Sequence, residues 1–122
     1  MCKILLSINP EHVENIMSGK KQYEFRKVLC KEKVDRIIIY STYPVMKVVG
    51  EAEVLNVLVN SPDAIWNETS SYSGITKHFF DDYYCNRDRA VAFHLGNVRK
   101  FKRPKELSDY GLKTAPQSFV YI

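Results

Sequence analysis

A glycine followed by an alternating polar and aromatic segment marks the change from helix to strand near the start of this chain. Gly19 suits the left-handed position that ends a helix, because it has no Cβ to clash there. After it, Glu24 and Arg26 share one parity and Tyr23 and Phe25 share the other, so a strand places the charges and the rings on opposite faces. The segment is then either an edge strand with a solvated charged face or one wall of a binding site.

The residues before Gly19 predict a strand followed by a short helix. Residues 3–8 form an apolar run typical of a buried strand. Asn9 then suits the N-cap of a helix, and Pro10 suits its first position, where the N–H would lack a partner in any case. The apolar residues that follow are spaced i, i+3, i+4 and define one face. A strand–helix–strand unit therefore leads into the charged segment.

The rest of the chain alternates short strands with helices. Strands are expected at 34–41, 45–59, 90–102 and 118–122, with Gly50 at a bulge, and helices are expected after Pro62 and over 75–84. Since no linker or repeat interrupts the chain, residues 1–122 are expected to form a single domain. The fold class predicted is α+β, a small mixed β-barrel with two to three short helices packed around it.

Three local features carry more specific expectations. Residues 69–74 are small and polar and predict a loop. Ile75, Phe79 and Tyr83 are spaced four residues apart and define an aromatic face of helix 75–84, whose favoured role is to dock the helix on the barrel rather than to stack on bases. Pro104 is expected to open a helical turn that Gly111 closes.

Composition narrows the possible environments and partners. The chain is 45% hydrophobic and 26% charged, which is ordinary for a globular domain. No stretch approaches the roughly 18 apolar residues of a membrane span, and the N-terminal apolar run is too short for a signal peptide, so we expect a cytoplasmic protein without a membrane partner. The net charge of +4 permits an anionic partner without requiring one.

The cysteines and histidines do not form a metal-binding pattern. Three cysteines are far apart in the sequence and none belongs to a C-x-x-C motif. The histidines have no ligand spacing either, and His12 is interpreted as a surface or packing residue. We therefore expect no metal and no cofactor.

The helix-to-strand segment also carries a family motif. Gly19, Lys21, Glu24 and Arg26 match the pattern G-x-K-x-x-E-x-R, which resembles the signature of the ASCH domain family within the PUA-like superfamily. Further resemblances to its small members lie in residues 6–10, 40–45, 49–52, 74–84 and 115–119. The resemblance implies a PUA-like β-barrel with a cleft between the first helix and the motif, and contact with RNA or a modified nucleobase.

The family that this chain resembles also includes enzymes. Some members resemble nucleases, and one branch consists of amidohydrolases that act on N(4)-acetylcytidine. In that branch the position of Glu24 is a threonine nucleophile beside the lysine, so the glutamate here counts against the deacetylase activity. A hydroxyl from Ser7, Ser41 or Thr42 would have to replace it. If the chain is an enzyme, Lys21 and Glu24 are the candidate catalytic residues.

The motif residues suit a nucleotide ligand. Lysine and arginine side chains neutralise phosphates, and a carboxylate accepts a hydrogen bond from an exocyclic amine such as that of cytosine, or orients a neighbouring lysine or arginine. A tyrosine supplies a stacking face, although core packing is the favoured role of Tyr40. The candidate ligand-binding residues are Ser7, Lys20, Lys21, Glu24, Arg26, Ser41 and Tyr43.

Three functions remain open. The leading one is a module that binds RNA or a modified nucleotide in the motif cleft. The second is a hydrolase acting on RNA or a nucleoside, and the third is a regulator that binds a protein partner. A second basic segment, residues 99–105, either extends an RNA track or forms a solvated turn with Phe101 tucked inward.

Overall fold

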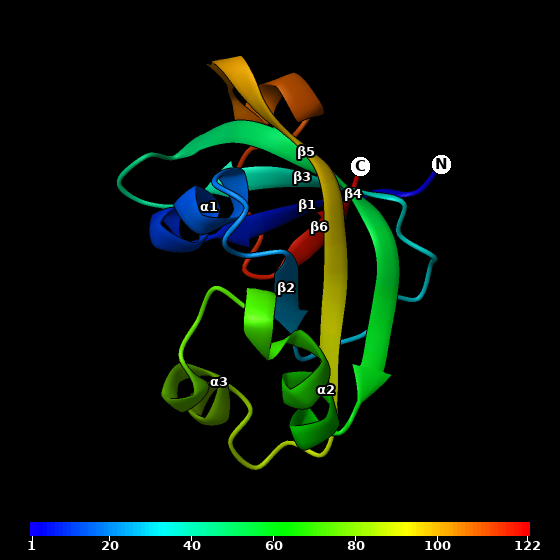
Figure 1. The fold of residues 1–122 in the computed structure, drawn as a ribbon. Coiled ribbons are helices and arrows are strands. Elements are labelled where there is room, and N and C mark those ends of the chain that lie inside the picture. The colour runs from blue at the N-terminus through cyan, green and yellow to red at the C-terminus, as the bar shows by residue number, and fades with distance from the viewer.

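The computed structural model describes all of residues 1–122 as one curled six-stranded sheet with three α-helices around it (Figure 1). The strands are β1 (Lys3–Ile8), β2 (Tyr23–Arg26), β3 (Arg36–Ser41), β4 (Lys47–Asn60), β5 (Ala90–Lys105) and β6 (Phe119–Tyr121). The helices are α1 (Pro10–Met17), α2 (Pro62–Thr69) and α3 (Lys77–Tyr83), with 3-10 helices η1 (Ser70–Tyr72) and η2 (Leu107–Tyr110). None of the helices has the length and apolar character needed to cross a lipid bilayer.

The sheet is mixed, which confirms the predicted α+β class with a small mixed barrel. Its strand order is β2-β5-β4-β3-β1-β6, and β1 pairs with β3 in parallel whereas the other neighbours are antiparallel. Helices α2 and α3 gather at the end of the sheet where β4 ends and β5 begins, and η2 lies at the opposite end (Figure 1). Strand β2 occupies one edge, next to β5, as predicted for an edge strand.

The local chemistry at the helix ends agrees with the sequence. The Asn9 side chain accepts a hydrogen bond from the Glu11 backbone N–H at 3.0 Å and Pro10 is the first residue of α1. Gly19 has a φ of +84°, as expected of the residue that closes the helix. The pairing of β4 shifts next to Gly50, where an added Cβ would lie 2.5 Å from the Arg99 carbonyl oxygen.

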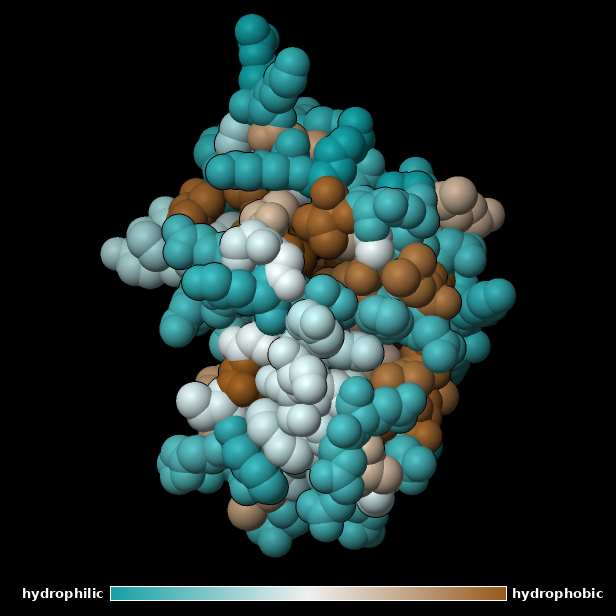
Figure 2. Space-filling model, in the orientation of Figure 1, coloured by the Kyte–Doolittle hydropathy of each residue, from teal (hydrophilic) through white to brown (hydrophobic).

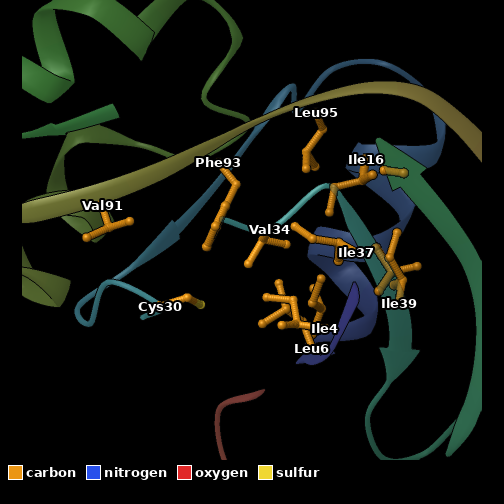
Figure 3. Packing of buried hydrophobic residues seen from close by; sticks show 13 residues of the cluster. Ile4, Leu6, Ile16, Cys30, Val34, Ile37, Ile39, Val91, Phe93 and Leu95 are labelled. Atoms are coloured by element: carbon orange, nitrogen blue, oxygen red, sulfur yellow. The ribbon is translucent and has the colours of Figure 1, made fainter. Parts of the chain in front are cut away.

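The main core lies between the curled sheet and α1. Side chains from β1, β3, β5 and α1 converge there, and Ile16 of α1 points toward Ile37 and Ile39 of β3 (Figure 3). Its members are Ile4, Leu6, Ile8, Val13, Ile16, Cys30, Val34, Ile37, Ile39, Ala52, Val91, Phe93 and Leu95. Burial of this cluster ties α1 to the sheet and so places the start of α1 beside β2.

A second, smaller core docks α2 and α3 on the sheet and corrects one prediction. Phe80 and Tyr84 are 1% and 3% exposed and pack with Phe25 of β2, whereas Phe79 is 47% exposed. The expectation that Ile75, Phe79 and Tyr83 dock the helix is therefore wrong for Phe79, whereas Ile75 and Tyr83 are partly buried against this core. Each residue turns the helix by about 100°, so Phe80 and Tyr84, which follow Phe79 and Tyr83, point more directly at the sheet.

Two further expectations differ from the structure. Pro104 lies inside β5 rather than opening a helix, in the stretch where the pairing of β5 with β4 shifts between Lys100 and Lys105. Its missing N–H costs no ladder bond there. Residues 70–72, predicted as loop, form η1, and the helical turn near the C-terminus is η2, which Gly111 closes with a φ of +75° as predicted.

Candidate functional site

A pocket opens between the start of α1, strand β2 and helix α3. It is a half-open hollow, and its empty space together with the solvent at its mouth is about 550 Å³. Eleven residues line it: Ser7, Ile8, Asn9, His12, Lys21, Glu24, Phe25, Arg26, Ile75, Phe79 and Tyr83. Its wall therefore combines charged groups from the motif segment with rings from α3.

Lys21 is the most buried charged side chain of the pocket. It is 3% exposed, its Nζ donates to the Ser73 carbonyl oxygen at 3.0 Å, and Nζ lies 4.7 Å from the centroid of the Phe25 ring. Burial lowers the pKa of its ammonium group, the Glu24 carboxylate opposes this shift, and Arg26 adds to it. Lys21 therefore loses its proton more readily than an exposed lysine does.

Glu24 and Arg26 form an ion pair within one strand. Arg26 donates from Nη2 at 2.7 Å and from Nε at 3.1 Å, both to Oε2 of Glu24, and Nη2 also donates to the Ser7 carbonyl oxygen at 3.0 Å. Glu24 is 6% exposed, so the interpretation of β2 as a strand with a solvated charged face is wrong, although β2 is an edge strand. Both bonds end on Oε2, which leaves Oε1 for a ligand.

His12, interpreted from the sequence as a surface or packing residue, lies in the wall of the pocket. Its ring meets the Phe79 ring edge-on with centroids 5.3 Å apart, and its buried Nδ1 has no hydrogen-bond partner. Burial lowers the pKa of the imidazole, the Lys21 charge lowers it further, Glu24 and Glu11 raise it, and Arg26 lowers it. The sequence signal for a pocket position is that His12 directly precedes Val13, a residue of the buried face of α1.

Aromatic side chains of α3 form the opposite wall. Phe79 and Tyr83 line the pocket together with Ile75, the three residues that were predicted to dock the helix. The Tyr83 hydroxyl donates to the Phe25 carbonyl oxygen at 3.3 Å, and Lys27 Nζ lies 4.5 Å from the centroid of the Tyr83 ring. These contacts hold the Tyr83 ring against β2.

The structure gathers some of the predicted site residues and separates others. Ser7, Lys21, Glu24 and Arg26 line the pocket, while Lys20 lines an adjoining groove. The Ser7 hydroxyl donates to the Pro116 carbonyl oxygen at 2.7 Å.

Two predicted residues lie outside the pocket. Ser41 is buried at the end of β3, and Tyr43 is 81% exposed in the turn that follows. Tyr40 is buried with Leu5, Ile38 and Val48 in a third apolar cluster, which confirms its predicted packing role. No group of three His, Cys, Asp or Glu side chains in the chain is arranged to hold a metal ion.

The second basic segment lies on β5 at the end of the sheet opposite α2 and α3 (Figure 1). It is strand rather than turn, but Phe101 is partly buried against the third apolar cluster, as the solvated alternative predicted. Arg99 and Lys105 lie 5.3 and 4.7 Å from the centroid of the Phe101 ring, and Arg99 donates to Glu51 at 2.6 Å. The remaining cations extend into solvent.

Comparison with known proteins identifies relatives over nearly the whole chain. ATP synthase subunit alpha and large ribosomal subunit protein uL22 of Ureaplasma parvum serovar 3 are each 32% identical over 120 residues, which is 98% of this chain. The chain spans only 15% and 39% of the length of these two proteins. An ASCH domain-containing ribonuclease of Zymomonas mobilis is 30% identical over 92 residues, covering 75% of this chain and 62% of the relative.

A solved structure and a family model also match this chain over most of its length. The crystal structure of ASCH from Zymomonas mobilis superposes with a TM-score of 0.89 at 27% identity, covering 98% of this chain and 87% of that one. A family described as "Domain of unknown function (DUF365)" matches residues 4–112. The chain therefore belongs to the DUF365 family and is a small ASCH domain with the PUA-like fold.

Proposed function

We propose that this domain, acting as one unit over residues 1–122 in the cytoplasm, binds RNA or a modified nucleoside in the pocket between α1, β2 and α3. The observation that carries the proposal is the pairing of an aromatic wall with converging charged groups. Phe79 and Tyr83 stand on α3, and Lys21, Glu24 and Arg26 stand on or next to β2. The RNA-related name of one relative, an ASCH domain-containing ribonuclease, supports it.

The chemistry of the pocket suits a nucleobase. Aromatic rings stack on bases at about 1–3 kcal/mol per base, whatever the sequence. Oε1 of Glu24 is placed to accept a hydrogen bond from an exocyclic amine such as that of cytosine. Arg26, held by Glu24 and the Ser7 carbonyl oxygen, keeps its charge inside the pocket for an anionic group of the ligand.

Hydrolysis of RNA or a nucleoside is the second candidate function. It is favoured by the burial of Lys21, whose lowered pKa raises the population of the neutral amine that a general base needs. Amidohydrolase chemistry has less support, because Glu24 stands where a threonine nucleophile is expected and the Ser7 hydroxyl already donates to Pro116. Binding of a protein partner is the third candidate.

The test is a titration of labelled single-stranded RNA at low and moderate salt against the wild type and a Lys21→Ala, Arg26→Ala double variant. The matched control is Lys31→Ala, Lys113→Ala, which removes two exposed positive charges outside the pocket. We expect binding that weakens steeply with salt, is lost in the double variant and is kept in the control. Analysis of the recovered RNA by gel then separates binding from cleavage.

Other outcomes have distinct meanings. If the double variant loses its cooperative thermal transition, Lys21 and Arg26 serve the fold and the site assignment is wrong. If the wild type binds no RNA, titration with free modified nucleosides tests the pocket alone. Salt-insensitive binding of a protein would favour the third function, since an apolar interface lacks the release of counterions from phosphates.

A further inference from the structure

A second groove adjoins the pocket and shares part of its wall. Asn9, His12, Ile75 and Phe79 line both hollows. Beyond these four, the groove is lined by small polar residues and by Glu11 and Lys20, and it is wide and open to solvent. In Figure 2 the surface over η1 and α2 is pale, between the hydrophilic and hydrophobic extremes, and is flanked by hydrophilic side chains.

The rings of His12 and Phe79 lie where the two hollows meet. They touch edge-to-face with centroids 5.3 Å apart, one from α1 and the other from α3. Each ring therefore presents a surface to the pocket and to the groove. A ligand that fills the pocket and continues into the groove has to cross this pair.

The groove differs from the pocket in its chemistry. Four of its eleven lining residues carry a hydroxyl group, and its formally charged residues are one base, Lys20, and one acid, Glu11. The Ser73 hydroxyl already bonds to the Ser70 and Ile75 carbonyl oxygens, whereas the exposed Ser71 side chain and the Lys20 ammonium group are open to a ligand. Such a wall suits the hydroxyls of a sugar and one phosphate better than a run of phosphates.

We propose that the groove binds the nucleotide next to the one held in the pocket, with Lys20 on the phosphate that joins the two. The ligand is then a single-stranded RNA chain of at least two nucleotides rather than a free nucleoside. This inference rests on the proposed function of the pocket. It also assigns a role to Lys20, which lies within the motif segment and lines the groove, whereas Lys21 lines the pocket.

The experiment compares ligands of increasing length by calorimetric titration. The four nucleosides identify the base that the pocket prefers. Its 3′- and 5′-monophosphates and the dinucleotides that carry it on either side follow, and chromatography of each recovered ligand checks that it was not cleaved. We expect one dinucleotide to bind about tenfold or more tightly than the nucleoside, as one additional stacked base would provide, and the monophosphate to fall between them.

Two variants test the groove without touching the pocket. Lys20→Gln removes the charge, and Ser71→Trp fills the groove from an exposed position. Ser71→Trp should reduce dinucleotide affinity to that of the nucleoside, Lys20→Gln should remove the part of the gain that the monophosphate shows, and neither should change nucleoside affinity. Lys113→Gln and Ser108→Trp, exposed positions outside both hollows, are the matched controls.

The failures of the two proposals are distinguishable. If nucleosides bind but dinucleotides bind no more tightly, or if the monophosphate equals the dinucleotide, the second nucleotide site is wrong and the pocket stands. Unchanged dinucleotide affinity in both Lys20→Gln and Ser71→Trp also overturns the groove. If neither nucleosides nor dinucleotides bind, the pocket itself has failed, and the groove proposal falls with it.

Discussion

Gly74 and Lys21 pack so closely that a Cβ added to Gly74 would lie 2.4 Å from the Cβ of Lys21. The two residues are far apart in the sequence, and the adjoining Ser73 carbonyl oxygen accepts the hydrogen bond from Lys21 Nζ. The turn after η1 therefore fixes both the stem and the head of the most buried lysine. Gly74 also has a φ of +69°, which side chains disfavour.

Gly74→Ala is expected to destabilise the domain and to weaken ligand binding, because the new methyl group displaces Lys21. Gly111→Ala is the matched control, since Gly111 has a similar φ of +75° but nothing within 4 Å of an added Cβ. Both variants should lose about 1 kcal/mol of unfolding free energy from the backbone term. Urea denaturation should show a further loss for Gly74→Ala only, and equal losses would mean that the clash with Lys21 is easily relieved.

Phe79 and Phe80 are neighbours with opposite expected roles. Phe80→Ala should reduce the free energy of unfolding by about 3 kcal/mol or more, because it leaves a cavity in the second core. Phe79→Ala should cost about 1 kcal/mol or less, since half of its ring is exposed, yet it should weaken nucleotide binding. Denaturant unfolding and RNA titration measure the two effects. A large loss of stability in Phe79→Ala would show that Phe79 docks α3 on the sheet.

The lowered pKa of His12 predicts that acid reduces stability. The folded domain holds a proton on His12 less tightly than the unfolded chain, whose histidines titrate near pH 6.5. The unfolded state therefore binds more protons, and stability falls as the pH decreases through about 6.5. Denaturation of wild type and His12→Phe at several pH values between about 7 and 5 should give a smaller fall in the variant.

The control for this experiment is Asn67→Phe, which adds the same ring at an exposed position of α2 and removes no titratable group. It should retain the wild-type dependence on pH. If His12→Phe and wild type show the same dependence, the burial of the His12 ring does not affect its proton affinity, and other groups account for the loss of stability in acid.

The basic end of β5 should contribute to binding of longer RNA. Lys100, Lys102 and Arg103 are exposed and have no acidic partner within ion-pair distance. Replacing all three with Gln should weaken binding of a long single strand and reduce the slope of log affinity against log salt by about 0.7 for each phosphate that is no longer neutralised. A variant with Gln at Lys31, Lys33 and Lys113 changes the net charge equally. Equal effects of the two triple variants would leave β5 as an ordinary solvated surface.

Much of the fold is predictable from the sequence because the signals act over a few residues. The Asn9 cap, the φ of Gly19 and the apolar run of β3 each depend on immediate neighbours, and each is confirmed. The motif also brings Lys21, Glu24 and Arg26 to notice, and strand alternation places the last two on one face, where they form an ion pair. Sequence alone therefore points to the Lys21, Glu24 and Arg26 part of the pocket wall, but not to His12.

Tertiary structure decides the other half. The aromatic wall comes from α3, far beyond the motif in the sequence, and its identity depends on how that helix rotates as it packs. Phe80 and Tyr84 fill the second core, and this burial turns Phe79 and Tyr83 toward Glu24. The four-residue spacing defines a face of α3 but does not say what that face contacts. The contact is decided by which rings bury the most apolar surface once β2 and β5 have paired.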